Sequence, residues 1–278
     1  MGLPRLTIHF ILSAAILAFA PAASFAGQAD LILDARTGQI LASENADDLN
    51  HPASLTKMMT LYLAFEALHD GKLKWDQRIT MSQNADGKDP YKLGVGVGRT
   101  VSVREAVYGM IVLSANDAAA LIGETLAGSE PAFGEMMTTK ARALGMSKTV
   151  FKNATGLPDP EQVTTARDMS TLAVALMNDF PEEFKLFSMR NFEFRGMKLR
   201  GHNNLMYRYQ GVDGIKTGFI DASGYNVVTS AKDGDRRVVG VVMGGKTADS
   251  RDAEMAALLD KYMPMASATP TTTLTASQ

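Results

Sequence analysis

The sequence predicts an α/β protein of the α+β type, in which an antiparallel sheet is flanked by helices and carries a helical subdomain. Two observations lead to this prediction. Short alternating apolar runs bounded by turn residues mark strands near both ends of the chain. The middle of the chain instead shows the apolar period of helices. A sheet built from both chain ends, with helices inserted between them, accounts for this order.

The first 26 residues are typical of a secretory signal peptide. Arg5 is their only charged residue, residues 8–20 form a short apolar run, and Ser24-Phe25-Ala26 is a small-x-small cleavage site. The apolar run is too short for a stable membrane span. We therefore expect cleavage after about Ala26 and no stable membrane anchor, an uncleaved anchor being the alternative. Residues 27–264 are predicted to form one domain.

Composition narrows the class of protein further. The net charge is −2, which argues against binding to nucleic acid. The chain has no Cys, so disulfides, a thiolate nucleophile and a cysteine–zinc site are excluded. We find neither a phosphate-binding loop nor a His/Asp cluster with metal-ligand spacing, so we predict no metal and no organic cofactor. With the signal peptide, these features fit a protein of the bacterial periplasm.

The N-terminal part is expected to contain a hairpin and a buried helix. Strands are predicted at 30–36 and 39–44, joined by a Thr37-Gly38 turn. A helix that starts near Pro52 is apolar nearly all round, so it should be buried, and it should end near Asp70-Gly71. The polar, Gly-rich segment 72–100 is interpreted as loops and short turns. It is either a substrate entrance or a surface connection.

The rest of the chain changes from helices to strands. Further helices are predicted at 101–113 with a Ser102 cap, then at 118–124, 132–144 and 165–178. Strands are predicted around 192–194 and at 211–219, 226–232 and 237–243, the last two joined by the turn 233–235. Helix 248–262 closes the domain. The tail, 265–278, is rich in Thr and Ser and is predicted to be disordered.

Three short motifs carry candidate chemistry. Ser54 and Lys57 are three residues apart, so on a helix the hydroxyl and the amine share a face. The free N–H groups and the dipole of a helix N-terminus would favour an oxyanion near Ser54. Ser114-Ala115-Asn116 and Lys216-Thr217-Gly218 follow later in the chain. S-x-x-K, S-x-N and K-T-G in this order form the motif set of serine β-lactamases and penicillin-binding proteins.

The serine hydroxyl needs a base, and histidine is an unpromising one here. There are four His residues, and His9 lies in the predicted signal peptide. His51, His69 and His202 stand in ordinary contexts, and we interpret each as structural or surface. A Ser-His-Asp triad is therefore not expected.

Lys57 is the alternative base. A free lysine has a pKa of about 10.4 and becomes a base near neutral pH only if burial or a nearby positive charge lowers that value. Lys216 could supply the charge, Ser114 could relay protons, and Asn116 could hold Lys57 or a substrate amide. The backbone N–H groups of Ser54 and Phe219 would form an oxyanion hole.

Over residues 29–262 the chain resembles the serine-type D-Ala-D-Ala carboxypeptidases, which are low-molecular-mass penicillin-binding proteins. Besides the three motifs, the resemblance rests on segments 34–38, 114–119, 153–157, 165–168 and 211–218. It implies a β-lactamase/transpeptidase-like fold, peptidoglycan stem peptides as substrates and β-lactams as covalent inhibitors. It also implies roles for eight residues: Ser54 as the acylated nucleophile, Lys57 as its proton acceptor, Ser114 and Asn116 as their partners, and Lys216, Thr217, Gly218 and Arg251 on the substrate side. Phe219, with its backbone N–H in the expected oxyanion hole, is the ninth candidate site residue.

Arg251 matches the place of the family's arginine that pairs with a terminal carboxylate, a task suited to a bidentate guanidinium. Some positions depart from the family pattern. Ala115 stands where members often have Gly, and Phe219 is followed by Ile220 instead of the frequent Thr. Many members continue into a β-rich domain and an amphipathic membrane helix. This chain ends soon after the domain, which favours a soluble or loosely associated protein.

Four functions compete on the sequence alone. A D-Ala-D-Ala carboxypeptidase is favoured, and a D,D-endopeptidase that cuts cross-links is close behind. A class A β-lactamase is disfavoured because no E-x-x-L-N lies between Ser114 and Lys216. A non-catalytic module that binds wall peptides is disfavoured because it would need neither Ser54 nor Lys57.

Overall fold

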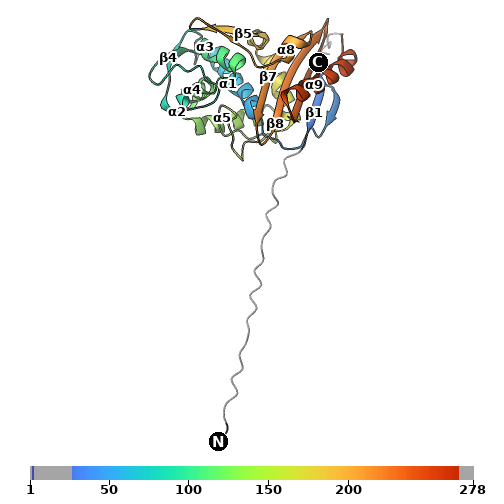
Figure 1. The fold of residues 1–278 in the computed structure, drawn as a ribbon, viewed down its shortest axis with the longest axis horizontal. Coiled ribbons are helices and arrows are strands. Elements are labelled where there is room, and N and C mark those ends of the chain that lie inside the picture. Colours follow the sequence, from blue (N-terminus) through green and yellow to red (C-terminus); the bar gives the residue numbers. More distant parts are fainter. Residues whose placement is uncertain (1, 3–26, 269–278) are drawn as a thin grey trace, which may run out of the picture.

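A computed structural model describes residue 2 and residues 27–268 of the chain. The rest of the predicted signal peptide and residues 269–278 lie outside the described residues. Five strands form an antiparallel sheet in the order β2-β1-β9-β8-β7. They are β1 (Ala29–Asp34), β2 (Ile40–Glu44), β7 (Val212–Ile220), β8 (Gly224–Asp233) and β9 (Arg236–Gly245). Figure 1 shows the blue N-terminal strands beside the orange and red C-terminal part, so the predicted sheet from both chain ends is confirmed.

Both faces of this sheet are covered by helices. Neighbouring residues of β9 point to opposite faces: Val241 belongs to the large core and Val242 to a smaller one. The smaller core lies under α9 (Ala248–Tyr262), which contributes Met255 and Leu259. On the other face, α6 (Ala166–Asp179) joins the large core. The predicted bounds of the closing helix agree with α9, whose Thr247 cap holds its first turn.

The helical subdomain is built around α1 (Lys57–His69), which is buried nearly all round as predicted. The helix starts later than expected, because Ser54 stands on a separate 3-10 turn, η1 (Ala53–Thr56). The other helical elements of the chain's middle are α3 (Val103–Tyr108), the π-helical turn η2 (Gly109–Leu113), α4 (Asn116–Ala127), α5 (Glu130–Ala143), α7 (Pro181–Phe184), η3 (Lys185–Ser188) and α8 (Leu205–Arg208).

The interpretation of 72–100 as loops and turns misses regular elements. Strands β3 (Arg78–Thr80) and β4 (Thr100–Ser102) pair with each other, and α2 (Gln83–Asp86) follows β3. Ile79 and Val101 face one another in this pair and are both buried. A strand with one buried residue shows no alternation, which explains why the pattern gave no signal. The expected Ser102 cap is confirmed, since its side chain accepts from the Glu105 N–H at the start of α3.

Two further expectations about the C-terminal half need revision. Phe192 and Phe194 belong to a complete hairpin of β5 (Asn191–Phe194) and β6 (Met197–Arg200), not to a lone strand. The start of the predicted disordered tail is ordered: Met265 ends the turn η4 (Met263–Met265), and Ala266 is buried. The Ser267 N–H donates to the Asp34 carboxylate at 2.8 Å. These contacts anchor residues 265–268 to the sheet.

Candidate active site

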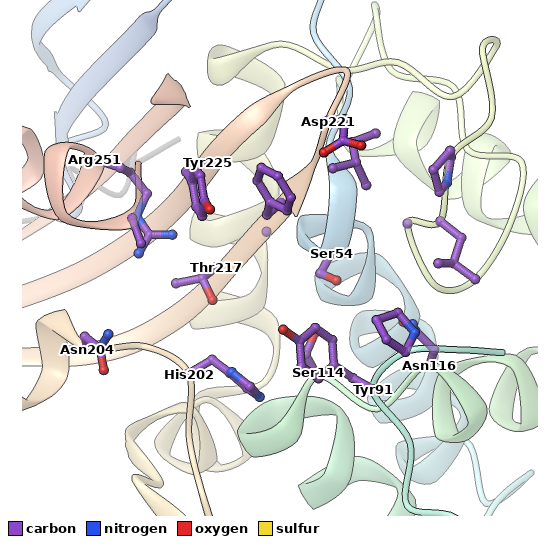
Figure 2. A pocket seen from close by; sticks show the side chains of 18 residues that line it. Ser54, Tyr91, Ser114, Asn116, His202, Asn204, Thr217, Asp221, Tyr225 and Arg251 are labelled. Atoms are coloured by element: carbon purple, nitrogen blue, oxygen red, sulfur yellow. The ribbon is translucent and has the colours of Figure 1, made fainter. Parts of the chain in front are cut away.

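A cleft of about 600 Å³ separates the helical subdomain from the edge strand β7. Figure 2 shows Ser54, Ser114 and Asn116 on the helical side and Thr217 on the strand. Seven of the nine predicted residues line this cleft: Ser54, Ser114, Asn116, Thr217, Gly218, Phe219 and Arg251. Lys57 and Lys216 lie behind them within hydrogen-bond distance of Ser54 and Ser114. The structure therefore brings all nine together.

Lys57 sits in a closed set of hydrogen-bond partners. Its Nζ lies 3.0 Å from Ser54 Oγ and donates to Asn116 Oδ1 at 2.7 Å and to the Thr155 carbonyl at 2.5 Å. Both carbonyl oxygens can only accept. A neutral amine has two N–H donors for these oxygens, so its lone pair is left for the Ser54 hydroxyl. The geometry is that of a general base beside its nucleophile.

The surroundings of Lys57 favour the neutral amine. The side chain is fully buried, at 0% exposure. Burial lowers the pKa of Lys57 well below its ordinary value, and the nearby charge of Lys216 lowers it further, while the Asp117 carboxylate opposes the shift. A lysine that reaches neutral pH partly deprotonated is what the serine requires.

Ser114 and Lys216 form a second hydroxyl–amine pair. Ser114 follows the π-helical turn in the left-handed conformation, with φ 61° and ψ 33°, which turns its side chain to the cleft. Lys216 Nζ donates to Ser114 Oγ at 3.0 Å and to the Thr217 carbonyl at 2.9 Å. Burial, with a smaller effect of the Arg251 charge, lowers the pKa of Lys216 to about 7. Lys216 is 3% exposed and lies behind the residues that line the cleft, among them its neighbour Thr217.

Asn116 and its neighbour Asp117 tie the cleft floor to the loop 87–98. Asn116 donates its side-chain amide to the Asp89 carbonyl at 3.1 Å, so both ends of this amide are used. Asp117 is fully buried and accepts the N–H groups of Leu93 and Gly94 at 2.9 and 3.0 Å. Asp117 was not predicted as a site residue, although it directly follows the S-x-N motif.

The loop 153–157 supplies the carbonyl that fixes Lys57. Asn153 Oδ1 accepts from the N–H groups of Thr155 and Gly156 at 3.1 and 2.8 Å, which shapes the turn. Gly156 has φ +84°, and a Cβ there would lie 1.8 Å from the Ala53 carbonyl oxygen. Only glycine fits this conformation and this approach to the Ser54 turn.

The strand side of the cleft is held against the Ser54 turn by Asn226 of β8. Its side-chain amide donates to the His51 carbonyl at 3.1 Å and accepts from the Gly244 N–H at 3.0 Å. At the end of β7, Phe219 is 46% exposed and its ring lies 4.3 Å from that of Tyr225. The two rings form an open aromatic surface on this wall.

Arg251 reaches the cleft from α9, as Figure 2 shows beyond Thr217. It is 3% exposed and already engaged: Nε and Nη2 donate to Asp252, and Nη1 donates to the Asn226 carbonyl. A guanidinium has five N–H donors, so these three bonds leave one N–H on each terminal nitrogen. The two remaining donors suit a carboxylate in the cleft.

His202 is exposed, which agrees with its interpretation as a structural or surface residue, but its position in the cleft was not predicted. His202 lines the cleft, and its ring meets Tyr91 edge-on at 4.7 Å (Figure 2). Partial burial and the charges of Lys216 and Arg200 lower the pKa of His202, so the ring is neutral at neutral pH. Tyr91 comes from the segment 72–100, which supports its interpretation as part of the substrate entrance. A lone His in a polar loop has no local pattern that could have revealed this position.

Two remaining features concern metals and membranes. Within the described residues, no group of three or more His, Cys, Asp or Glu side chains is arranged to hold a metal ion. Over the same part of the chain, every helix is too short or too polar to cross a bilayer.

The fold and the two hydroxyl–lysine pairs define the class: this is the architecture of the serine penicillin-binding proteins. The D-alanyl-D-alanine carboxypeptidase family (peptidase S11) matches residues 17–247. The chain belongs to this family.

Individual relatives agree with that assignment. The chain is 37% identical over 236 residues to the D-alanyl-D-alanine carboxypeptidase DacA of Escherichia coli strain K12, which covers 82% of this chain and 59% of DacA. The chain thus spans about three fifths of this curated relative. Penicillin-binding protein 5 of Haemophilus influenzae superposes with a TM-score of 0.81 at 36% identity, over 84% of this chain and 70% of that one. Penicillin-binding protein D2 of Listeria monocytogenes, solved in an ampicillin-bound form, superposes with a TM-score of 0.77 at 34% identity, over 84% of this chain and 95% of that one.

Proposed function

We propose that this protein is a serine D-Ala-D-Ala carboxypeptidase that removes the terminal D-Ala from peptidoglycan stem peptides. The observation that carries the proposal is the position of Lys57 Nζ, 3.0 Å from Ser54 Oγ, with its other two bonds fixed by carbonyl oxygens. The family to which the chain belongs supports the choice of substrate.

In the proposed reaction, Lys57 takes the proton of the Ser54 hydroxyl as Oγ attacks the carbonyl carbon between the two D-alanines. The backbone N–H groups of Ser54 and Phe219 stabilise the oxyanion. The bond to the terminal D-Ala then breaks, and its amine takes a proton delivered through Lys57 and Ser114. Water, deprotonated by the same lysine, hydrolyses the ester on Ser54 and regenerates both groups.

Recognition of the leaving D-Ala is assigned to the other wall. Thr217 and the two open N–H groups of Arg251 would hold its carboxylate, and the buried Lys216 would orient Ser114. β-Lactams carry a carboxylate and a reactive carbonyl, so they would acylate Ser54 in the same place. We also propose that the chain is exported to the bacterial periplasm after cleavage near Ala26.

D-Ala release tests the function. The mature chain, a Ser54→Ala variant and a Ser188→Ala control at an exposed serine would receive a pentapeptide ending in D-Ala-D-Ala and a cross-linked peptide dimer. Release from the pentapeptide by the wild type and the control, and none by Ser54→Ala, is expected. Cleavage of the dimer alone would replace the proposal by an endopeptidase. No product and no penicillin adduct by mass would overturn the Ser54 mechanism.

A further inference from the structure

The cleft carries opposite charges on different sides of Ser54. Of the described residues that line it, Asp221 is the one acidic side chain, and Arg251 is the one permanently basic side chain. Figure 2 shows Arg251 beyond Thr217 and Asp221 well away from both, past Ser54. If Arg251 and Thr217 hold the terminal carboxylate, Asp221 lies where the earlier residues of a bound peptide would go.

The Asp221 carboxylate is free to meet a ligand. It is exposed in the turn that follows β7, and no hydrogen bond or ion pair joins it to another described residue. The acidic groups elsewhere around the site are occupied: Asp117 accepts backbone N–H groups, and Asp252 is bound to Arg251. Of the two charged side chains among the described residues that line the cleft, Arg251 is paired with Asp252 and Asp221 is not paired, which points to a cationic group of the ligand beside Asp221.

Apolar side chains accompany this carboxylate. Ile220 directly precedes Asp221, and Leu157 and Pro158, which follow the turn at Gly156, line the same cleft. An apolar surface that ends in a carboxylate matches a side chain with a methylene stem and a charged amino head. Lysine and similar diamino acids have this form.

The direction of the edge strand supports the same placement. β7 is the last strand of the sheet, so an extended peptide can pair with its free edge. In antiparallel pairing, the peptide's carboxyl end lies beside Thr217 and its earlier residues lie toward Ile220. Thr217 and Asp221 are four residues apart along the chain, about 13 Å if extended. Three extended peptide residues cover about 10 Å, which leaves the third side chain within reach of Asp221.

We infer that Asp221 is a specificity-determining residue that binds the side-chain amino group of a diamino acid placed directly before D-Ala-D-Ala. Ile220, Leu157 and Pro158 contact the methylene stem of that side chain. This inference rests on the proposed function, since it concerns the same cleft and the same peptide.

Three matched substrates test it. Nα-acetyl-X-D-Ala-D-Ala would be supplied with X as lysine, norleucine or glutamate, the first two differing in the amino group. The wild type is expected to cleave the lysine peptide with a kcat/KM about 2- to 5-fold above that of norleucine, the range of an exposed ion pair. Glutamate should rank last. The preference for lysine should shrink in 0.5 M salt, because exposed charges are screened.

Variants then assign the preference to one carboxylate. Asp221→Asn should bring the lysine-to-norleucine ratio to about 1, and circular dichroism with thermal unfolding checks separately that the variant folds. Asp235→Asn, at the distant turn between β8 and β9, should keep the wild-type ratio. Asp221→Lys should place glutamate above lysine.

The outcomes separate this inference from the proposed function. Equal rates for lysine and norleucine in the wild type, or a ratio that Asp221→Asn leaves unchanged, would overturn the role of Asp221 while D-Ala release continued. If no peptide released D-Ala, both the inference and the proposed function would fall. Even if a variant does not fold, equal wild-type rates for lysine and norleucine would overturn the inference.

Discussion

The two walls of the cleft differ in how their polar groups are used. On the helical wall, Lys57 and Asn116 are buried and each donates to fixed carbonyl oxygens. On the strand wall, Phe219 and Asp221 are exposed, and the Asp221 carboxylate has no partner among the described residues. The helical wall is hydrogen-bonded within the protein, whereas the strand wall also presents exposed groups that can exchange water for a ligand.

This difference separates chemistry from recognition. A base must have its pKa and orientation set before substrate arrives, and buried hydrogen-bonded groups provide that preorganisation. A recognition surface has to exchange water for substrate, so it stays exposed. Substitutions on the helical wall should therefore lower the rate for every substrate, and those on the strand wall should change the ranking of substrates.

Lys57→Arg is expected to have the largest effect. Arginine keeps its proton under all relevant conditions, so kcat/KM for D-Ala release should fall by about 10³-fold, within the range of a lost general base. The rate constant for acylation by penicillin should fall similarly. Lys140→Arg, which keeps an ion pair with Glu66 elsewhere, is the matched control. Activity of Lys57→Arg within tenfold of the wild type would exclude Lys57 as the base.

Arg251→Lys should affect selectivity more than chemistry. Lysine keeps the charge but loses the fork that engages a carboxylate, so kcat/KM for a free-acid peptide should fall about tenfold. The rate for the same peptide with a C-terminal amide should hardly change, and the acid-to-amide ratio measures this. An equal fall for both peptides would show that Arg251 supports the fold of α9 and not the substrate carboxylate.

Lys216→Met should produce the smallest change of the three variants, a change in stability. The variant should lose activity, because Lys216 orients Ser114, but its fold should become more stable. The pKa of Lys216 is lowered from 10.5 to about 7 in the folded chain, so the unfolded chain binds more protons between these values. Burying the charged amine lowers the free energy of unfolding of the wild type. This destabilisation is complete below about pH 7 and disappears as the pH rises toward 10.5. The variant should therefore be more stable than the wild type at pH 6, by about 1 kcal/mol, with a gap that closes by pH 10.

Urea unfolding at both pH values measures this difference. Lys185→Met, at an exposed lysine, serves as the control and should show no such dependence on pH. A Lys216→Met chain less stable than the wild type at pH 6 would mean that the contacts of this amine outweigh its desolvation.

The two walls also differ in how far the sequence could predict them. The helical wall is set by local spacing, and Ser54 and Lys57 meet because a helical turn brings i and i+3 together. Its other contacts come from far along the chain: Thr155 reaches Lys57 through a glycine turn that only the packed structure explains. The S-x-N motif indicated a further part of the helical wall and the K-T-G motif the strand wall, but neither motif shows that Lys216 is buried behind the residues that line the cleft.

Elements with long periodic patterns were predicted well, and short or single-residue features were not. The closing helix was correct to the residue, because Thr247 caps it and its apolar face repeats over four turns. The pair β3–β4 buries one residue per strand, so its sequence shows no alternation of apolar and polar residues. His202 reaches the cleft from a polar loop, whose sequence has no periodic pattern either. The order at 265–268 depends on contacts with Asp34 and Arg236 that composition cannot show.

The carbonyl of Thr155, 98 positions from Lys57, makes the reactivity of this protein a reporter of its own tertiary structure. A chain whose 153–157 loop is not docked lacks the carbonyl that orients Lys57, and water reaching this lysine would weaken the burial that lowers its pKa. Such a chain cannot be acylated at neutral pH, even though all its catalytic residues are present. A fluorescent penicillin should therefore label native molecules and leave incompletely folded chains unlabelled.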